Sequence, residues 1–188
     1  MSRGLYSFNE KKEYSPEISI QLKRLYNKLH KELPFLPICA WDNKWFNEFT
    51  NHQMFKHFMV IETEKDAIES VFNRLITPTG PFVFLDPDES TFGNYIGNHD
   101  TAIIVKTMVS ESPTIQTSGI VCASLEKLLV DCLADPIMFG AQQNELNTIF
   151  QEAMSRYKVN VNAMKRYARR RNKHKELEKQ LQNNGKSG

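Results

Sequence analysis

Residues 56–76 read KHFMVIETEKDAIESVFNRLI and join two different hydrophobic patterns. Residues 56–62 are apolar at their centre, as in a buried strand, whereas the residues after Thr63 repeat apolar side chains at helical spacing. Thr63 is placed to cap this helix. The apolar face of the helix comprises Ala67, Ile68, Val71, Phe72, Leu75 and Ile76. A strand followed directly by an amphipathic helix predicts an α/β fold.

The same alternation extends along the chain in both directions. Ser15 is predicted to cap a helix that starts at Pro16 and stops at Pro34. Ser124 is predicted to cap another helix, after which the chain looks helical to Leu181, and the final residues NNGKSG look disordered. Further strands are predicted at residues 35–41, 81–85, 101–106 and 120–123, and short helices at residues 42–49 and 86–96.

The expected architecture is a small mixed or parallel sheet of about four to five strands, flanked by helices and followed by a C-terminal helical extension. The apolar centre of residues 101–106 fits a sheet that is covered on both faces. Three segments are distinguished: a connecting helix in residues 1–34, an α/β core in residues 35–155 and a basic helical extension in residues 156–188.

Charge is distributed unevenly along the 188 residues, although the formal net charge is only +2. Residues 1–155 contain 13 basic and 20 acidic residues, whereas residues 156–188 contain 11 basic and 2 acidic residues. An acidic body with a basic end predicts a polyanion or an acidic partner at that end.

The most basic run, RYARRRNKHK, occupies residues 166–175. In a helix, Met164 and Tyr167 would anchor one face to the body and leave the positive charges in water. A simple solvated face is one interpretation, and phosphate binding is the favoured one, because each neutralised phosphate releases counterions. The expected nucleic-acid-binding residues are Lys165, Arg166, Arg169, Arg170 and Lys173.

Several function classes lack their sequence signals. No apolar run approaches the roughly 18 residues of a membrane span, and the N-terminus lacks the apolar stretch of a secretory signal, so a cytoplasmic protein without membrane contact is expected. The odd number of cysteines, without CxxC spacing, predicts that Cys39, Cys122 and Cys132 are reduced core residues. The chain has no GxSxG, P-loop or GxGxxG motif, and no cofactor or metal is expected.

Two other patterns have competing interpretations. GNHD at residues 97–100 is interpreted as a turn, and His52 and His57 are not spaced as a preset metal pair. Acidic pairs after two strands could bind Mg²⁺ for phosphodiester cleavage, although helix capping also explains them. The residues of this alternative nuclease site are Glu62, Glu64, Asp86 and Asp88.

Five stretches form an ordered set that is specific to one family. They are WDNKWFNEFTNHQ (41–53), MVIETEKDAIESVFNRL (59–75), IIVKTMVSESP (103–113), GIVCASLEKLLVDCLAD (119–135) and RYARRRNKHKE (166–176). Together they resemble antitoxins related to AbiEi of the abortive-infection AbiE systems, in the form common in Bacteroidetes. The resemblance covers about residues 3–180. Its motif residues are Trp41, Ser110, Glu111, Ser112, Pro113, Glu126, Lys127 and Asp131.

This resemblance implies a non-enzymatic antitoxin and transcriptional autoregulator of a bacterial type IV toxin-antitoxin operon. The implied toxin is nucleotidyltransferase-like, and type IV antitoxins counteract the toxin without a stable complex being assumed. Family members place a winged helix-turn-helix before the antitoxic domain, and MSRGLYSF (1–8) resembles its final wing hairpin. Arg3 and the basic tail are then expected to contact operator DNA or another nucleic acid. A metal-dependent nuclease and an RNA-binding adaptor are the alternatives.

Overall fold

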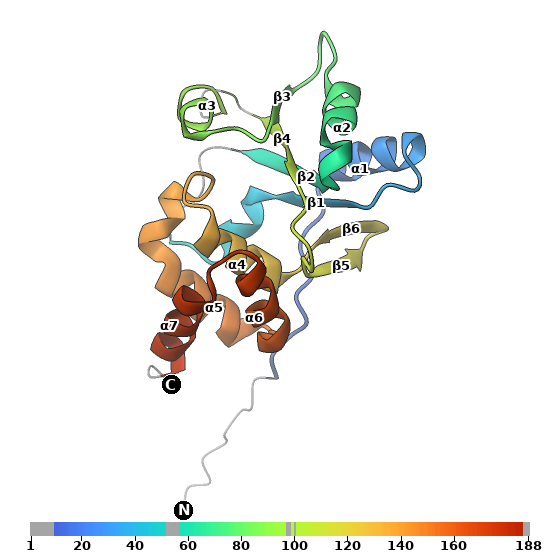
Figure 1. The fold of residues 1–188 in the computed structure, drawn as a ribbon. Helices are drawn as coiled ribbons and strands as arrows, with labels where there is room; N and C mark the ends of the chain where they lie inside the picture. Colours follow the sequence, from blue (N-terminus) through green and yellow to red (C-terminus); the bar gives the residue numbers. More distant parts are fainter. Residues whose placement is uncertain (1–9, 52–56, 97–98, 100, 186–188) are drawn as a thin grey trace, which may run out of the picture.

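The computed structural model describes residues 10–51, 57–96, 99 and 101–185 of the chain. Within these residues, six strands form one mixed sheet with the order β3-β4-β2-β1-β6-β5 (Figure 1). The strands are β1 Ile38–Asp42, β2 Phe58–Thr63, β3 Phe82–Leu85, β4 Ala102–Thr107, β5 Thr114–Thr117 and β6 Ile120–Ala123. The expected α/β class is confirmed, and the sheet has more strands than the four to five expected.

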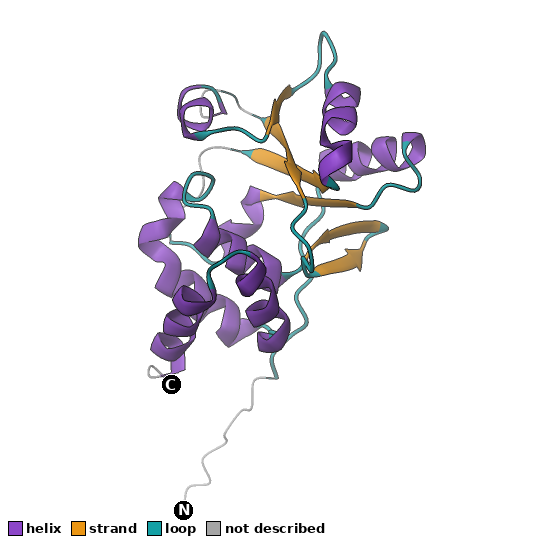
Figure 2. Ribbon diagram, in the orientation of Figure 1, coloured by secondary structure: helices purple, strands orange, loops and turns teal. Residues whose placement is uncertain are grey.

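Helices lie on both sides of this sheet and continue after its last strand (Figure 2). They are α1 Ile20–Glu32, α2 Ile68–Leu75, α3 Glu89–Asn94, α4 Leu125–Ala134, α5 Leu146–Arg156, α6 Val161–Arg170 and α7 His174–Gly185. Short 3₁₀ helices occur as η1 Asn43–Glu48, η2 Lys65–Ala67 and η4 Gly140–Glu145. The helical extension predicted for residues 156–188 is therefore present as α6 and α7.

Strand β2 lies inside the sheet, antiparallel to β1 and parallel to β4. All of its residues are buried, because α1 and α2 pack on one side of the sheet and the α4 to α7 group packs on the other (Figure 1). Glu62 of β2 is in register with Lys106 of β4. Partners in register project to the same face, so both side chains lie on the face that α4 approaches.

One hydrophobic core contains residues from all three segments distinguished in the sequence. It includes Leu22 of α1, Ile61 of β2 and Leu177 of α7, each fully buried. The N-terminal segment also bonds directly to the C-terminal region, because the Lys12 amide donates to the Arg156 carbonyl at 3.1 Å. The basic extension is therefore packed into the same core as the sheet.

The strand missing from the prediction is β5, at one edge of the sheet. Its sequence TIQT alternates half-buried and exposed residues and lacks the apolar run of a central strand. A two-residue turn joins β5 to β6, with Ser118 at φ 52° and Gly119 at φ 81°. Both values lie in the left-handed region that a type I′ hairpin turn requires, and glycine adopts it without strain.

Two predicted helix caps are wrong. The cap of α1 is Ser19, whose side chain accepts from the Leu22 amide at 3.2 Å, and not Ser15. Thr63 ends β2, and its hydroxyl donates to the Pro37 carbonyl at 2.8 Å and does not cap α2. A tertiary hydrogen bond has replaced the local one. The predicted cap Ser124 of α4 is confirmed. Asp42 caps η1, the short helix predicted at residues 42–49.

Several predictions lie outside the described residues: the wing remnant at residues 1–8 with Arg3, His52, and three of the four residues of GNHD. Helix α7 continues to Gly185, so residues 183–185 are helical where the sequence looked disordered. All three cysteines are buried, as predicted. Among the described helices, none has both the length and the apolar character needed to cross a membrane.

Candidate functional site

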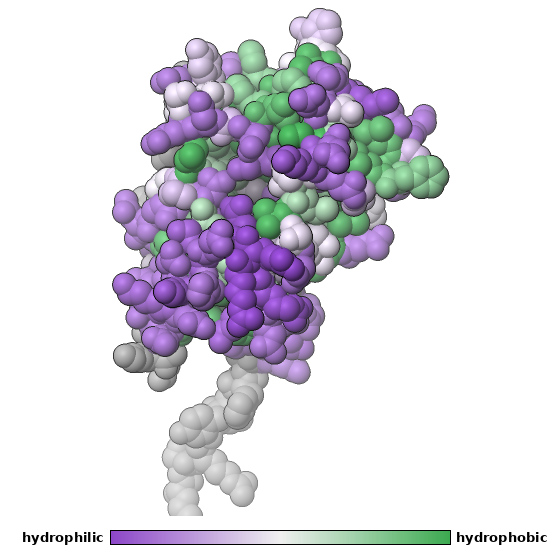
Figure 3. Space-filling model, in the orientation of Figure 1, coloured by the Kyte–Doolittle hydropathy of each residue, from purple (hydrophilic) through white to green (hydrophobic). Residues whose placement is uncertain are grey.

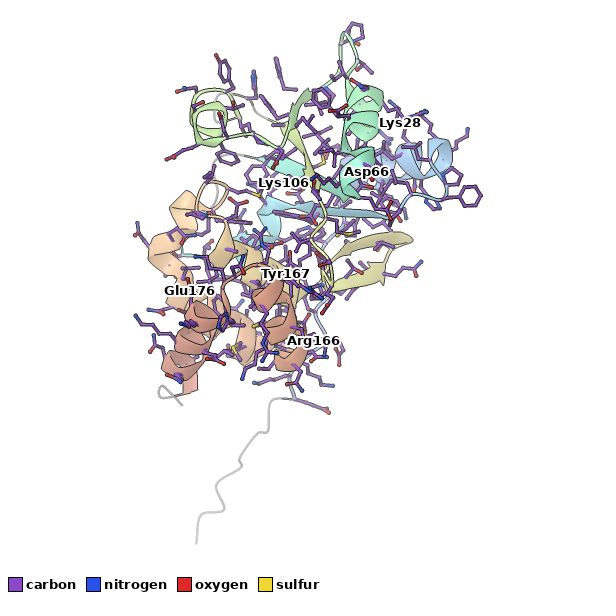
Figure 4. The ribbon with its side chains drawn as sticks, viewed as in Figure 1. Lys28, Asp66, Lys106, Arg166, Tyr167 and Glu176 are labelled. Atoms are coloured by element: carbon purple, nitrogen blue, oxygen red, sulfur yellow. The ribbon has the colours of Figure 1, made fainter. Side chains whose placement is uncertain are left out.

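The most deeply buried lysine, Lys127 of α4, lies at the centre of a group of charged side chains. Its side chain is 1% exposed, and its Nζ lies 2.9 Å from Glu62 Oε2 and forms an ion pair with Asp131. The same nitrogen donates to the Tyr167 hydroxyl at 3.3 Å. Lys127 therefore joins β2, α4 and α6, at the junction where Figure 4 labels Tyr167.

Local sequence explains how α4 presents these groups. Ser124 follows β6 directly, and its side chain accepts from the Lys127 amide, so the helix starts at a fixed place above the sheet. Lys127 and Asp131 are one turn apart and share a face. Glu62 is the penultimate residue of β2 and projects toward that face. The acid from the strand and the acid from the helix thus reach one ammonium group.

Two further side chains complete the group from β1 and from the end of α6. Trp41 Nε1 donates to Glu62 Oε1 at 3.3 Å, and the Tyr167 hydroxyl donates to Asp131 Oδ1 at 2.7 Å. Arg171 Nε lies 3.2 Å from the same Asp131 oxygen, at ion-pair distance but outside hydrogen-bond geometry. We term this set the buried charge network: Trp41, Glu62, Lys127, Asp131, Tyr167 and Arg171.

Burial and neighbouring charges shift the pKa values of three members of the network. Burial raises the pKa of Glu62, an effect that the positive charge of Lys127 opposes. Burial alone would lower the pKa of Lys127, but Asp131 and Glu62 raise it well above its ordinary value. Burial raises the pKa of Tyr167, so its hydroxyl keeps its proton. The two carboxylates beside Lys127 therefore favour its charged form.

There is little free space beside the network. The adjoining cavity, lined by Trp41, Glu62, Asp131 and Arg171 among others, has a volume of about 20 Å³. A cavity needs at least roughly 10–15 Å³ to hold one water molecule, so this one accommodates a water but no substrate. The buried charge network therefore links α6 to the sheet. The space beside it is too small to be a reaction pocket.

The SESP turn, residues 110–113, lies next to the buried charge network. The Ser112 hydroxyl donates to the Val109 carbonyl at 2.7 Å, and the Ser124 amide donates to the Pro113 carbonyl at 3.1 Å. Glu111 has a φ of 60°, which is uncommon for a residue other than glycine. Its carboxylate accepts from Arg170 Nε at 2.9 Å. The turn thus contacts the exposed side of α6, while the buried charge network contacts its buried side.

Glu126 lies apart from the network and fixes the start of α6. Its Oε2 accepts from the Ser124 hydroxyl at 2.6 Å, and its Oε1 accepts from the Asn160 amide at 2.7 Å. Asn160 is the N-cap of α6, with its side chain accepting from the Ala163 amide at 3.0 Å. The motif residues that the resemblance indicated therefore all lie on, or next to, the elements that hold α6.

Helix α6 presents its basic residues outward, as predicted. Met164, Tyr167 and Ala168 are buried and anchor the helix. The predicted nucleic-acid-binding residues are exposed or half-buried: Lys165, Arg166, Arg169, Arg170 and Lys173. In Figure 3 the most hydrophilic colours gather over the C-terminal helices, while apolar colours gather over the opposite end of the molecule. The sequence run becomes one surface, which we term the basic face: Lys165, Arg166, Arg169, Arg170 and Lys173.

Three cations near the end of α6 have acidic partners. Arg170 pairs with Glu111, Arg171 with Asp131, and Lys173 with Glu176 at 3.1 Å. Lys165, Arg166 and Arg169 have no ion pair with an acid in the described part of the chain. The basic face is therefore only partly neutralised from within the protein.

The four carboxylates of the alternative nuclease site do not come together as one set. Glu62 belongs to the buried charge network, and Asp88 caps α3 by accepting from the Thr91 amide at 2.7 Å. Asp86 is exposed and lies 3.8 Å from Lys106 Nζ, and Glu64 is exposed after β2. Within the described ranges, no three His, Cys, Asp or Glu residues are grouped closely enough to hold a metal ion.

Two further ion pairs were not predicted from the sequence. His57 Nε2 lies 2.9 Å from Asp42 Oδ2, and Lys106 Nζ donates to Asp135 Oδ2 at 2.8 Å. Lys106 lowers the pKa of Asp135, overcoming the opposite effect of burial. Each pair joins residues from different elements, so no local spacing indicated it. Only the strand register that sets Lys106 beside Glu62 could have suggested a second charged contact on this face.

Comparison with known proteins gives one match. A model described as "Family of unknown function (DUF6577)" matches residues 1–187 of the chain. Separate searches of the curated proteins and of the solved structures found no match. The match covers nearly the whole chain.

Proposed function

The chain belongs to the DUF6577 family of unknown function, and we propose that it is a non-enzymatic antitoxin of the AbiEi type. In this proposal it resides in the cytoplasm, binds phosphates of operator DNA or another nucleic acid through the basic face, and represses its own operon. It counteracts a nucleotidyltransferase-like toxin, and no stable complex with that toxin is required.

One observation carries the proposal: residues that the resemblance singled out in separate stretches meet around one helix. Lys127 and Asp131 hold the inner face of α6, and Trp41 donates to Glu62, the acid that pairs with Lys127. Glu126 holds the start of α6, and Glu111 contacts its outer side. A set of motif residues that only stabilised a core would have no reason to gather around the most basic helix. Their arrangement supports a role in which α6 must be presented firmly.

The basic face suits phosphate contacts better than base recognition. Four of its five positive side chains stand on α6, which is anchored by three buried residues. Arginine and lysine bind the phosphate backbone mainly through charge and do not depend on the base sequence. The predicted contact is therefore tight at low salt, weak at high salt and similar for different sequences.

The antitoxin proposal is tested by growth rescue. The chain is co-expressed with the nucleotidyltransferase encoded beside it, and restored growth is the expected result. A variant in which Lys165 and Arg169 are replaced by alanine keeps the buried charge network and serves as the matched test of the basic face. Failure of the wild-type protein to rescue growth, when it is folded and expressed at the level of the toxin, would reject the antitoxin role.

Binding assays with duplex DNA, single-stranded DNA and single-stranded RNA separate the remaining functions. A preference for single-stranded RNA would favour an RNA-binding adaptor, since a basic helix need not distinguish DNA from RNA. Cleavage of plasmid DNA that depends on Mg²⁺ would favour the nuclease. The antitoxin proposal predicts binding to duplex DNA without cleavage.

A further inference from the structure

The contact between Glu111 and Arg170 has the geometry of a guanidinium that grips an anion. Arg170 Nε donates to Glu111 Oε1 at 2.9 Å, and Arg170 Nη2 contacts the same oxygen. About half of each side chain remains exposed, at 52% for Arg170 and 44% for Glu111. Arginine also binds phosphate through two nitrogens, although there the two N–H groups usually meet two different oxygens.

A second arginine stands one helical turn away on the same helix. Arg166 and Arg170 have the i, i+4 spacing of neighbours on a helix surface. Both positive charges lower the pKa of Glu111, Arg170 most strongly. The carboxylate therefore lies within the field of two exposed guanidinium groups.

The SESP turn delivers Glu111 to this place. Glu111 adopts a left-handed backbone conformation, with φ of 60°, and two anchored residues follow it. Ser112 is bonded to Val109, and Pro113 accepts from the first residue before α4. The turn thus holds Glu111 in a backbone conformation that a glutamate rarely adopts.

We propose that Arg166 and Arg170 form a phosphate-binding site that Glu111 occupies in the free protein. A nucleic-acid phosphate displaces the Glu111 carboxylate when it binds, so the SESP turn is an internal competitor of the nucleic acid. This inference rests on the proposed function, because it assigns a specific phosphate site within the basic face. Covalent attachment of the competitor makes it present at a high effective concentration.

Glu111→Gln tests the proposal, because it removes the negative charge and keeps the side chain's size. Fluorescence anisotropy with a labelled duplex DNA at low salt is expected to show binding tightened by about three- to tenfold, with a salt slope steeper by about one to two phosphates. Glu178→Gln is the matched control. It removes the same charge from an exposed position of α7 that has no ion pair with the basic face in the described part of the chain, and its effect is expected to stay below about twofold.

The double variant Arg166→Ala and Arg170→Ala provides a further check. In that background, Glu111→Gln is expected to give no further gain, because the site it would open is gone. Equal gains for Glu111→Gln and Glu178→Gln, or a gain that persists without the two arginines, would overturn the proposal. Either result would mean that Glu111 acts only through the general charge of the surface. Thermal unfolding shows whether each variant is folded. If Glu111→Gln does not fold, Glu111→Ala repeats the test.

Inorganic polyphosphate, used as a second probe, separates this inference from the proposed function. Tighter polyphosphate binding by Glu111→Gln, without any binding to DNA or RNA, would support the phosphate site and reject nucleic acid as its ligand. Nucleic-acid binding by the wild-type protein that Glu111→Gln leaves unchanged would reject the internal competitor and leave the proposed function standing. No binding to any probe by either protein would reject both.

Discussion

Helix α6 meets charged groups on both of its sides, and the two sides behave differently. Its inner side joins the buried charge network through Tyr167, which is fully buried. Its outer side presents Arg166 and Arg169 to water. The buried side of the helix is therefore held in place by the network. The arginines of its exposed side remain free for a partner.

The physical reason is the difference in solvation. Removing one member of a buried ion pair leaves its partner charged and without water, which costs about 3–5 kcal/mol. An exposed ion pair is screened by water and contributes about 0–1 kcal/mol. The inner side should therefore affect stability, and the outer side should affect binding, with little overlap between the two.

Lys127→Met, on the inner side, should lower the stability of the fold more than any other substitution considered. It leaves Glu62 and Asp131 buried without their shared ammonium, and we expect the free energy of unfolding to fall by about 3–5 kcal/mol. Urea denaturation measures the loss. Lys175→Met, at an exposed position of α7, is the control and should change stability by less than about 0.5 kcal/mol. A loss below about 1 kcal/mol for Lys127→Met would mean that the network does not hold α6.

Tyr167→Phe tests a single hydrogen bond of the network. It removes the hydroxyl that donates to Asp131 at 2.7 Å, and the expected loss is about 1.5–3 kcal/mol, as is typical for a hydrogen bond to a charged group. Tyr95→Phe, at a tyrosine that is 59% exposed, should leave urea denaturation within about 0.5 kcal/mol of the wild type. Equal effects of the two substitutions would argue against a special role for the buried hydroxyl.

A smaller effect is expected at the edge of the buried face, where Lys106 pairs with Asp135. The pKa of Asp135 is lowered in the folded protein, so the pair stabilises the fold above the unfolded pKa of about 3.9 and this stability is lost as the pH falls through the folded pKa. Lys106→Met should lower stability by up to about 1 kcal/mol at neutral pH, because the pair is partly solvated.

Melting temperatures of the wild type and of Lys106→Met, followed from neutral to acid pH, measure this effect. The difference between the two proteins should shrink as the pH falls below about 4. A difference that stays constant over the whole range would show that Lys106 stabilises the fold by packing and not through its charge.

The sequence predicted well where local patterns decide the structure. The strand around Val60, the cap at Ser124 and the anchoring of α6 by Met164 and Tyr167 all follow from periodicity or capping. Strand β5 was missed, because a short edge strand of alternating polar residues resembles a loop.

The site could be predicted only in part. Lys127 and Asp131 were indicated by resemblance, but their partner Glu62 lies 65 residues before Lys127, and no local spacing reveals that contact. Glu62 was instead considered a metal ligand, because an acid at the end of a strand suggests metal binding. The cap assigned to Thr63 failed for a similar reason, since its hydroxyl bonds to the Pro37 carbonyl in another segment. The cap assigned to Ser15 failed because a second serine, Ser19, caps α1 through a local hydrogen bond.

The central claim is that the outer side of α6 binds phosphate while the inner side maintains the fold. Its most direct test is the salt dependence of binding to a labelled duplex of about 20 base pairs over about 50–200 mM salt. Lys165 and Arg169 are replaced together by alanine, because Arg170 is already engaged by Glu111.

We predict that this double variant binds all duplexes more weakly, with a salt slope lower by about two, and melts within about 2 °C of the wild type. Unchanged affinity with an unchanged salt slope would contradict phosphate binding by the outer side of α6. A large fall in melting temperature would contradict the claim that only the inner side maintains the fold.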